Sequence, residues 1–164
     1  MGKITPEILK ELLSYEPETG VLRWRKHRGG TASIGTISGT VSNRGYRMVS
    51  IFGRDYQAHR LIWMYTHGAW PSEQIDHING NKDDNRIINL REATNAENQR
   101  NSTKQKNNRS GFKGVYRRYQ KGKWWARLRV DGVNIYLGGF DNPEKAAEAY
   151  AQAAQKYHGV FSRT

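Results

Sequence analysis

The sequence contains no cysteine, so it forms no disulfide, no thiolate zinc site and no thiol nucleophile. Any metal ion must therefore be held by oxygen and nitrogen ligands. The sequence also lacks an apolar run long enough to span a bilayer, and Met1-Gly2-Lys3-Ile4 leads into an amphipathic segment rather than a signal peptide. We therefore expect a cytoplasmic protein that acts without a membrane.

Acidic residues are scarce relative to basic ones. The chain of 164 residues carries 27 Lys and Arg against 15 Asp and Glu, a formal net charge of +12. Residues 1–100 hold 14 basic and 11 acidic residues, and residues 101–164 hold 13 and 4, so most of the excess is C-terminal. No basic amphipathic helix with a large apolar face is evident, so this excess favours a nucleic acid over a membrane as the partner.

Residues 75–98 place oxygen and nitrogen donors suited to metal-assisted hydrolysis within one short unit. Residues 75–78, which include Asp76 and His77, have the apolar flanks of a strand, and residues 87–90 have the pattern of a return strand. Asn79-Gly80 between them is typical of a hairpin turn. This pattern predicts a two-stranded element with Asp76 and His77 at its centre.

A helix is predicted to follow these strands. Thr94 and Glu97 have the spacing of a capping box, in which each side chain satisfies a backbone N–H at the helix start. Asn98 should therefore lie in the first turns of this helix. Strand, strand and helix together predict a ββα finger over residues 75–100.

Asp76-His77, Asn89 and Asn98 in this order resemble the HNH nucleases, in the phage homing-endonuclease branch whose last His is replaced by Asn. The resemblance implies that His77 is the general base that deprotonates the attacking water. It also implies that Asp76 and Asn98 ligate one divalent metal ion and that Asn89 holds the loop that orients His77. Carboxylate and amide oxygens suit Mg²⁺ or Mn²⁺ better than zinc, and the unperturbed histidine pKa of about 6.5 suits a base at working pH.

A structural alternative exists for each of these residues, because Asp, His and Asn beside Asn-Gly are also ordinary turn residues. Asp83 and Asp84 are not assigned as ligands, since a solvated loop with local backbone hydrogen bonds explains them as well. His59 is the only rival catalytic histidine, and we expect it to support the site rather than to act as the base.

The remainder of residues 1–100 is predicted to form a scaffold for this finger. Thr5-Pro6-Glu7 begins a short helix whose apolar stripe includes Leu13, and residues 21–24 read as a strand. Residues 34–60 are rich in Gly, Thr and β-branched residues and predict a β-meander, in which no chemistry is evident. Residues 58–65 predict a helix.

A polar, basic linker is expected at residues 101–110, because this stretch has no apolar periodicity. Lys104, Lys106 and Arg109 are predicted to follow a nucleic-acid backbone.

The C-terminal part contains a hairpin whose register can be read directly. Asp131-Gly132 is a type I′ turn signal that should pair Val130 with Val133 and Arg127 with Tyr136. Alternation then predicts a core face made by Trp124, Ala126, Leu128, Val130, Val133, Ile135 and Leu137. The opposite face combines guanidinium, amide and aromatic groups suited to reading the major groove, and its predicted DNA contacts are Trp125, Arg127, Arg129, Asn134 and Tyr136.

Two more elements complete this part. A strand around residues 114–118 should add Tyr116 and Arg118 to the DNA-binding face. Asn142-Pro143-Glu144 should begin a helix with a small-residue face, and Gly159 should end it.

Residues 110–161 resemble the plant ethylene-response-factor, or apetala-two, type of DNA-binding domain. The motifs that carry this resemblance are residues 111–115, residues 136–140 and the Ala-Ala-Glu-Ala-Tyr run at 146–150. Tyr116 and Tyr136 stand where that family commonly has Arg or Trp, and Arg127 replaces a typical acid. The base preference of that family therefore does not transfer to this chain.

We therefore predict an α+β protein with an HNH nuclease domain at 1–100, a basic linker at 101–110 and a DNA-binding domain at 111–164. The DNA-binding domain should be a three-stranded antiparallel sheet packed on one helix. The expected activity is hydrolysis of phosphodiester bonds in double-stranded DNA, by nicking, in a monomer with one metal ion per site; a dimer would allow double-strand cleavage. The alternative is a non-catalytic, sequence-specific transcriptional regulator with a degenerate finger.

Overall fold

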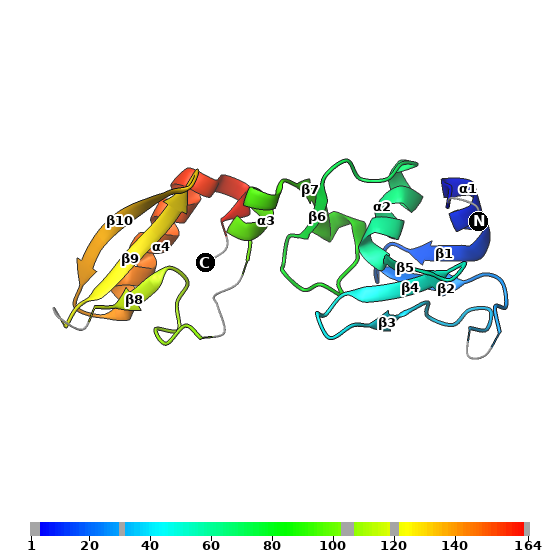
Figure 1. The fold of residues 1–164 in the computed structure, drawn as a ribbon, viewed down its shortest axis with the longest axis horizontal. Coiled ribbons are helices and arrows are strands. Elements are labelled where there is room, and N and C mark those ends of the chain that lie inside the picture. The colour runs from blue at the N-terminus through cyan, green and yellow to red at the C-terminus, as the bar shows by residue number, and fades with distance from the viewer. Residues whose placement is uncertain (1–3, 30–31, 103–106, 119–121, 163–164) are drawn as a thin grey trace. The chain divides into compact units, whose positions relative to one another are not determined.

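The computed structural model describes residues 4–29, 32–102, 107–118 and 122–162. The chain forms two compact units, Met1–Thr94 and Asn95–Thr164, and Figure 1 shows the elements of each. Lys104 and Lys106, two predicted DNA contacts, lie outside the described residues. Among the helices described, none has the length and apolar character needed to cross a membrane.

The first unit begins with helix α1 (Pro6–Leu12), whose start matches the capping pattern of the sequence. The Thr5 hydroxyl accepts a hydrogen bond from the Ile8 N–H at 3.4 Å, and a proline occupies the first turn. Leu13 was predicted to be helical, and this prediction is wrong. Leu13 instead begins strand β1 (Leu13–Glu16), because pairing with Trp24 of β2 (Val21–Trp24) buries both side chains in one antiparallel hairpin.

A β-meander and a helix follow. Strands β3 (Thr40–Val41), β4 (Arg47–Ile51) and β5 (Arg54–Gln57) form an antiparallel sheet in the order β3-β4-β5, as the sequence predicts. Helix α2 (Ala58–His67) comes directly after β5 and ends at Gly68, whose φ of 76° is the left-handed conformation typical of a helix end.

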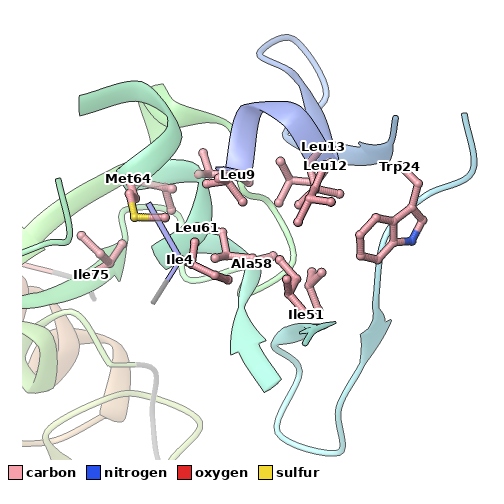
Figure 2. Packing of buried hydrophobic residues seen from close by; sticks show 14 residues of the cluster. Ile4, Leu9, Leu12, Leu13, Trp24, Ile51, Ala58, Leu61, Met64 and Ile75 are labelled. Atoms are coloured by element: carbon pink, nitrogen blue, oxygen red, sulfur yellow. The ribbon is translucent and has the colours of Figure 1, made fainter. Parts of the chain in front are cut away.

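The core of the first unit draws on nearly all of its elements, as Figure 2 shows. Its fourteen buried apolar residues are Ile4, Leu9, Leu12, Leu13, Leu22, Trp24, Val49, Ile51, Ala58, Leu61, Ile62, Met64, Ile75 and Leu90. Ile75 and Leu90 tie strands β6 (Gln74–His77) and β7 (Leu90–Ala93) to this core. The segment that carries Asp76 and His77 therefore rests on a packed scaffold.

Strands β6 and β7 pair antiparallel, with Asp76 opposite Arg91 and His77 opposite Leu90. The return strand was predicted at 87–90 after a tight turn at Asn79-Gly80, and the structure corrects this. Residues 78–89 form a long loop that ends in the 3₁₀ helix η1 (Ile87–Asn89). The physical reason is that buried Asn89 bonds to the loop backbone, which holds the chain out of the strand pairing at this point.

The second unit begins with helix α3 (Asn95–Arg100), which starts directly after Thr94 as the capping box predicts. Strands β8 (Val115–Arg117), β9 (Trp124–Val130) and β10 (Val133–Phe140) form an antiparallel sheet in the order β10-β9-β8. The predicted register of β9 and β10 is confirmed from Val130–Val133 to Arg127–Tyr136. Asp131 and Gly132 have φ values of 47° and 84°, the positive values that a type I′ turn requires.

The register shifts by one residue between Tyr136 and Gly138, so that Gly138 pairs with Ala126. Val133 was predicted to be in the core, but it is 66% exposed. It lies beside the turn, at the end of the sheet, where its side chain remains in solvent.

Helix α4 (Pro143–His158) packs on this sheet through its small-residue face, and the short 3₁₀ helix η3 (Gly159–Phe161) follows it. The Asn142 side chain caps α4 by accepting a hydrogen bond from the Lys145 N–H at 2.9 Å. The buried residues of this unit are Val115, Ala126, Leu128, Ala146, Tyr150 and Ala154. Gly114 allows the close approach, since a Cβ there would lie 2.1 Å from the Tyr150 ring.

Candidate functional site

His77 lies at the end of β6 and is only 4% exposed. Its Nε2 is 3.1 Å from Oδ1 of Asn85, a loop residue that is 1% exposed. Burial lowers the pKa of His77, although the hydrogen bond with Asn85 and the carboxylate of Asp76 act in the opposite direction. The ring is therefore neutral near pH 7, which is the state that a general base needs.

Asp76 precedes His77 and is equally buried. Its Oδ2 accepts hydrogen bonds from Arg91 Nε at 2.9 Å and from Arg91 Nη2 at 2.8 Å, and the two residues face each other across β6 and β7. Arg91 was not predicted as part of the site. A buried carboxylate needs such a partner.

Asn89 organises the loop that follows His77. Its Oδ1 accepts from the Asn79 N–H at 2.9 Å, and its Nδ2 donates to Asn79 Oδ1 at 3.0 Å and to the Asp84 carbonyl at 2.8 Å. Its own backbone carbonyl accepts from the Ile78 N–H at 2.9 Å. These bonds join the two ends of the loop.

His59 of α2 and Tyr46 of the meander pack around His77. The ring centroids of His59 and His77 are 5.0 Å apart with an interplanar angle of 84°, an edge-to-face contact. The Tyr46 ring lies 5.3 Å from His59 and 6.1 Å from His77. Burial, together with the charges of His77 and Arg60, lowers the pKa of His59 to about 3, so this ring stays neutral.

Asp83 and Asp84 are engaged in ion pairs within the loop. Asp83 accepts from Arg47 Nε and Nη2, each at 2.9 Å, and Asp84 accepts from Arg86 Nε at 2.8 Å and Nη2 at 2.6 Å. The hydrogen bonds from Arg86 hold the pKa of Asp84 at about 2. Both carboxylates thus tie the loop together.

The N-terminal hairpin also supports this loop. The Tyr15 hydroxyl donates to the Asn85 carbonyl at 3.2 Å and accepts from the Ile87 N–H at 2.9 Å. Gly20, with φ of 75°, lies so close that a Cβ would be 2.4 Å from the Arg86 nitrogen. The loop backbone therefore packs directly against the β1–β2 turn.

The predicted metal ligands fall in different units, because Asn98 lies in α3 of the second unit. Within the described ranges, no three His, Cys, Asp or Glu side chains are grouped so as to hold a metal ion. The donor chemistry nevertheless fits Mg²⁺, which is commonly bound through one or two protein oxygens while water and substrate phosphate supply the rest. In the first unit, Asp76 has the oxygen donors that such an ion prefers.

The predicted DNA-binding face of the second unit carries stacked cationic and aromatic side chains. The Arg127 guanidinium lies 5.7 Å from the centroid of the Tyr116 ring, and that of Arg118 lies 5.5 Å from the Trp125 ring. Tyr116 and Trp125 are cross-strand neighbours of β8 and β9, as the predicted faces require. Exposed side chains on this face come from Arg118, Arg127, Arg129, Asn134 and Tyr136.

Arg109, which was predicted to lie in a linker, lines a shallow groove on the second unit together with Tyr116, Arg127, Arg129 and Asn134. The structure therefore brings one predicted backbone contact and four predicted base contacts to the same surface.

Sequence reasoning missed Asn85, Arg91 and the contribution of the meander. Asn85 lies in an Asp-Asp-Asn-Arg run that looks like a solvated loop, and only its burial reveals its role. Arg91 could have been found by pairing the strands correctly, because it stands opposite Asp76. Tyr46 and Arg47 are far from the site in sequence, and no local pattern marks them.

Comparison with known proteins found two kinds of similarity. Residues 56–100 match the family described as HNH endonuclease. A stretch of 57 residues is 47% identical to the AP2-like ethylene-responsive transcription factor CRL5 of Oryza sativa subsp. japonica, covering 34% of this chain and 9% of that protein.

A second similar protein is the AP2-like ethylene-responsive transcription factor AIL7 of Arabidopsis thaliana, which is 47% identical over 55 residues. That match covers 32% of this chain and 11% of the relative, so the chain spans about a tenth of the length of these relatives. None of the solved structures matches the chain. The chain thus carries an HNH endonuclease domain beside a stretch with AP2-like homologues.

Proposed function

We propose that this protein is a metal-dependent DNA endonuclease of the HNH homing type, which nicks DNA at sites selected by its second unit. The observation that carries the proposal is that the HNH-matching residues 56–100 contain a buried, neutral His77 next to Asp76, on a loop closed by Asn89. This combination places a general base beside a carboxylate oxygen on a fixed scaffold.

In this proposal His77 takes a proton from the water that attacks the scissile phosphate. Asp76 and Asn98 would hold one divalent ion, Mg²⁺ or Mn²⁺, which supplies charge neutralisation at the phosphate and its leaving oxygen when bound. Arg91 orients the carboxylate of Asp76 by two hydrogen bonds. Asn89 maintains the loop and acts on the reaction only through His77.

DNA binding is assigned mainly to the second unit. We assign the stretch that is similar to the AP2-like factors to this unit, because the unit carries the motifs of residues 111–115, 136–140 and 146–150. Base edges can accept hydrogen bonds from the guanidinium groups of Arg127 and Arg129, and can both donate to and accept from the amide of Asn134. Arg109 follows the phosphate backbone. We propose that the protein acts on double-stranded DNA in the cytoplasm as a monomer.

The test is a cleavage assay with the purified full-length protein and supercoiled plasmid. We expect open circles to accumulate in the presence of Mg²⁺ or Mn²⁺ and to be absent when EDTA is added. Sequencing of the ends on a genomic library would then define the site.

A second candidate function is a DNA-binding regulator without nuclease activity. The AP2-like relatives favour it, since both are described as transcription factors. Duplex binding with no nicks under any divalent metal would support this candidate and contradict the nuclease proposal.

A further inference from the structure

The side-chain amide of Asn85 has only one orientation that satisfies its surroundings. Its Nδ2 lies 3.3 Å from the backbone carbonyl of Asp83, and its Oδ1 lies 3.1 Å from His77 Nε2. A carbonyl oxygen only accepts hydrogen bonds, so the NH₂ group must face Asp83 and the amide oxygen must face His77. That oxygen also only accepts, and therefore His77 Nε2 must carry a hydrogen.

The backbone around this amide is held by neighbouring elements. Arg47 holds the Asp83 carboxylate by two hydrogen bonds of 2.9 Å, and Tyr15 donates to the Asn85 carbonyl at 3.2 Å. Asn85 is 1% exposed, so water cannot replace its partners without local opening. The two partners of the amide, His77 and the Asp83 carbonyl, therefore decide its orientation.

We infer that Asn85 is a positioning residue that fixes the tautomer of His77 and makes Nδ1 the basic atom of the site. In a neutral imidazole only one nitrogen carries a hydrogen, so a proton on Nε2 leaves the lone pair on Nδ1. The consequence for catalysis rests on the proposed nuclease function, whereas the tautomer itself follows from the hydrogen bonds. The opposite tautomer would place the proton on Nδ1, where it blocks proton uptake from water.

The experiment compares three variants of the full-length protein with the wild type. Asn85→Leu keeps the shape of the side chain but removes the acceptor, and Asn85→Asp keeps an acceptor facing His77. Asn43→Leu makes the same chemical change at an exposed position and serves as the control. The ring ¹⁵N shifts of His77, measured at about pH 8 where histidine is neutral, report the tautomer. kcat, KM and duplex affinity are measured in parallel.

We expect the wild type, Asn85→Asp and Asn43→Leu to carry the hydrogen on Nε2. Asn85→Leu should move part of the population to the Nδ1–H form and lower kcat about 10- to 100-fold, as loss of an orienting partner typically does. KM and duplex affinity should not change, which separates a positioning role from a general loss of structure.

A wild-type ring with its hydrogen on Nδ1 would overturn the inference, and so would an Asn85→Leu protein with an unchanged tautomer and kcat. If Asn85→Leu does not fold, Asn85→Ala takes its place with the same two outcomes. A wild type that binds duplex but never cleaves it would overturn the proposed function alone, because the ring shifts still show which nitrogen of His77 carries the hydrogen.

Discussion

At the scale of single residues, His77 is the group whose removal should separate chemistry from binding. We expect His77→Ala to lower the single-turnover cleavage rate by about 10²- to 10⁴-fold, the usual contribution of a general base. Duplex affinity should stay nearly constant, because the phosphate contacts that hold the complex are made elsewhere. Quantified plasmid nicking and binding isotherms measure the two effects.

His67→Ala is the matched control for this substitution, since it removes an exposed histidine from the end of α2. The His67→Ala protein should cleave DNA at the wild-type rate. Undiminished cleavage by His77→Ala would contradict the assignment and direct attention to His59, whose ring contacts that of His77.

Asp76 combines a proposed ligand role with a structural one, and the choice of substitution matters. Asp76→Ala would leave Arg91 buried without a carboxylate, whereas Asp76→Asn keeps an oxygen that accepts from Arg91. We therefore expect Asp76→Asn to fold and to need a higher Mg²⁺ concentration for half-maximal cleavage. Metal titrations of the cleavage rate measure this, and Asp55→Asn on β5 is the control. An unchanged metal requirement would exclude Asp76 as a needed ligand.

His59 should make stability depend on pH. Its folded-state pKa is about 3 and its unfolded value is about 6.5, so below pH 6.5 the unfolded chain binds a proton that the folded chain does not. Above pH 6.5 the buried His59 therefore does not lower the free energy of unfolding. As pH falls from 6.5 towards 3, it lowers the free energy of unfolding by up to about 1.4 kcal/mol per pH unit.

Urea unfolding of the wild type and His59→Leu, at about pH 7 and about pH 5, isolates this effect. The wild type should lose more stability between the two conditions than the variant. Equal losses would show that His59 takes up its proton without opening the core.

At the scale of elements, the β9–β10 turn depends on two positive φ values. Gly132→Val would force a β-branched residue to φ of 84°, which should destabilise the second unit by about 1–2 kcal/mol or more. Asp131→Asn should be neutral, because Asn accepts the same conformation. Thermal unfolding monitored by tryptophan fluorescence checks both, and a Gly132→Val protein as stable as the wild type would mean that the turn relaxes to another type.

The elements that could be predicted are those whose signals are local. The hairpin register follows from Asp131-Gly132, and the starts of α1 and α4 follow from Thr5-Pro6 and Asn142-Pro143, since each signal acts within a few residues. The return strand was misplaced because residues 87–90 have strand-like composition while Asn89 is needed by the loop.

The site, like the fold, could be predicted only in part. Asp76, His77 and Asn89 could be named because they lie close together in sequence and follow a recognisable order. Arg47 and Tyr15 reach the loop from 36 and 72 positions away, and such contacts exist only once the core has formed. Long-range packing therefore determines how the loop is held, and local sequence patterns do not reveal it.

At the scale of the whole molecule, the two units should divide the work of cleavage and site choice. We expect Arg127→Ala to cost about 1–3 kcal/mol of affinity for the cognate site and to flatten the preference over a scrambled duplex. Lys145→Ala, at an exposed position of α4, removes a positive charge away from the sheet face and should leave the preference intact.

Binding isotherms on both duplexes at several salt concentrations measure these effects. Equal losses by Arg127→Ala on cognate and scrambled DNA would show that the sheet contacts only the backbone. Site choice would then have to come from the first unit.

The contact of Gly20 and Tyr15 with the loop of Asn85 bears on how this part of the chain can be transferred to another protein. The matched segment 56–100 holds His77, Asp76 and Asn89, but their loop also rests on Tyr15 and Gly20 of the N-terminal hairpin and is held by Arg47 of β4. A graft of the matched segment alone would therefore transfer these residues without the contacts that hold their loop. The part of the chain that keeps the loop and its supports together is the first unit as a whole.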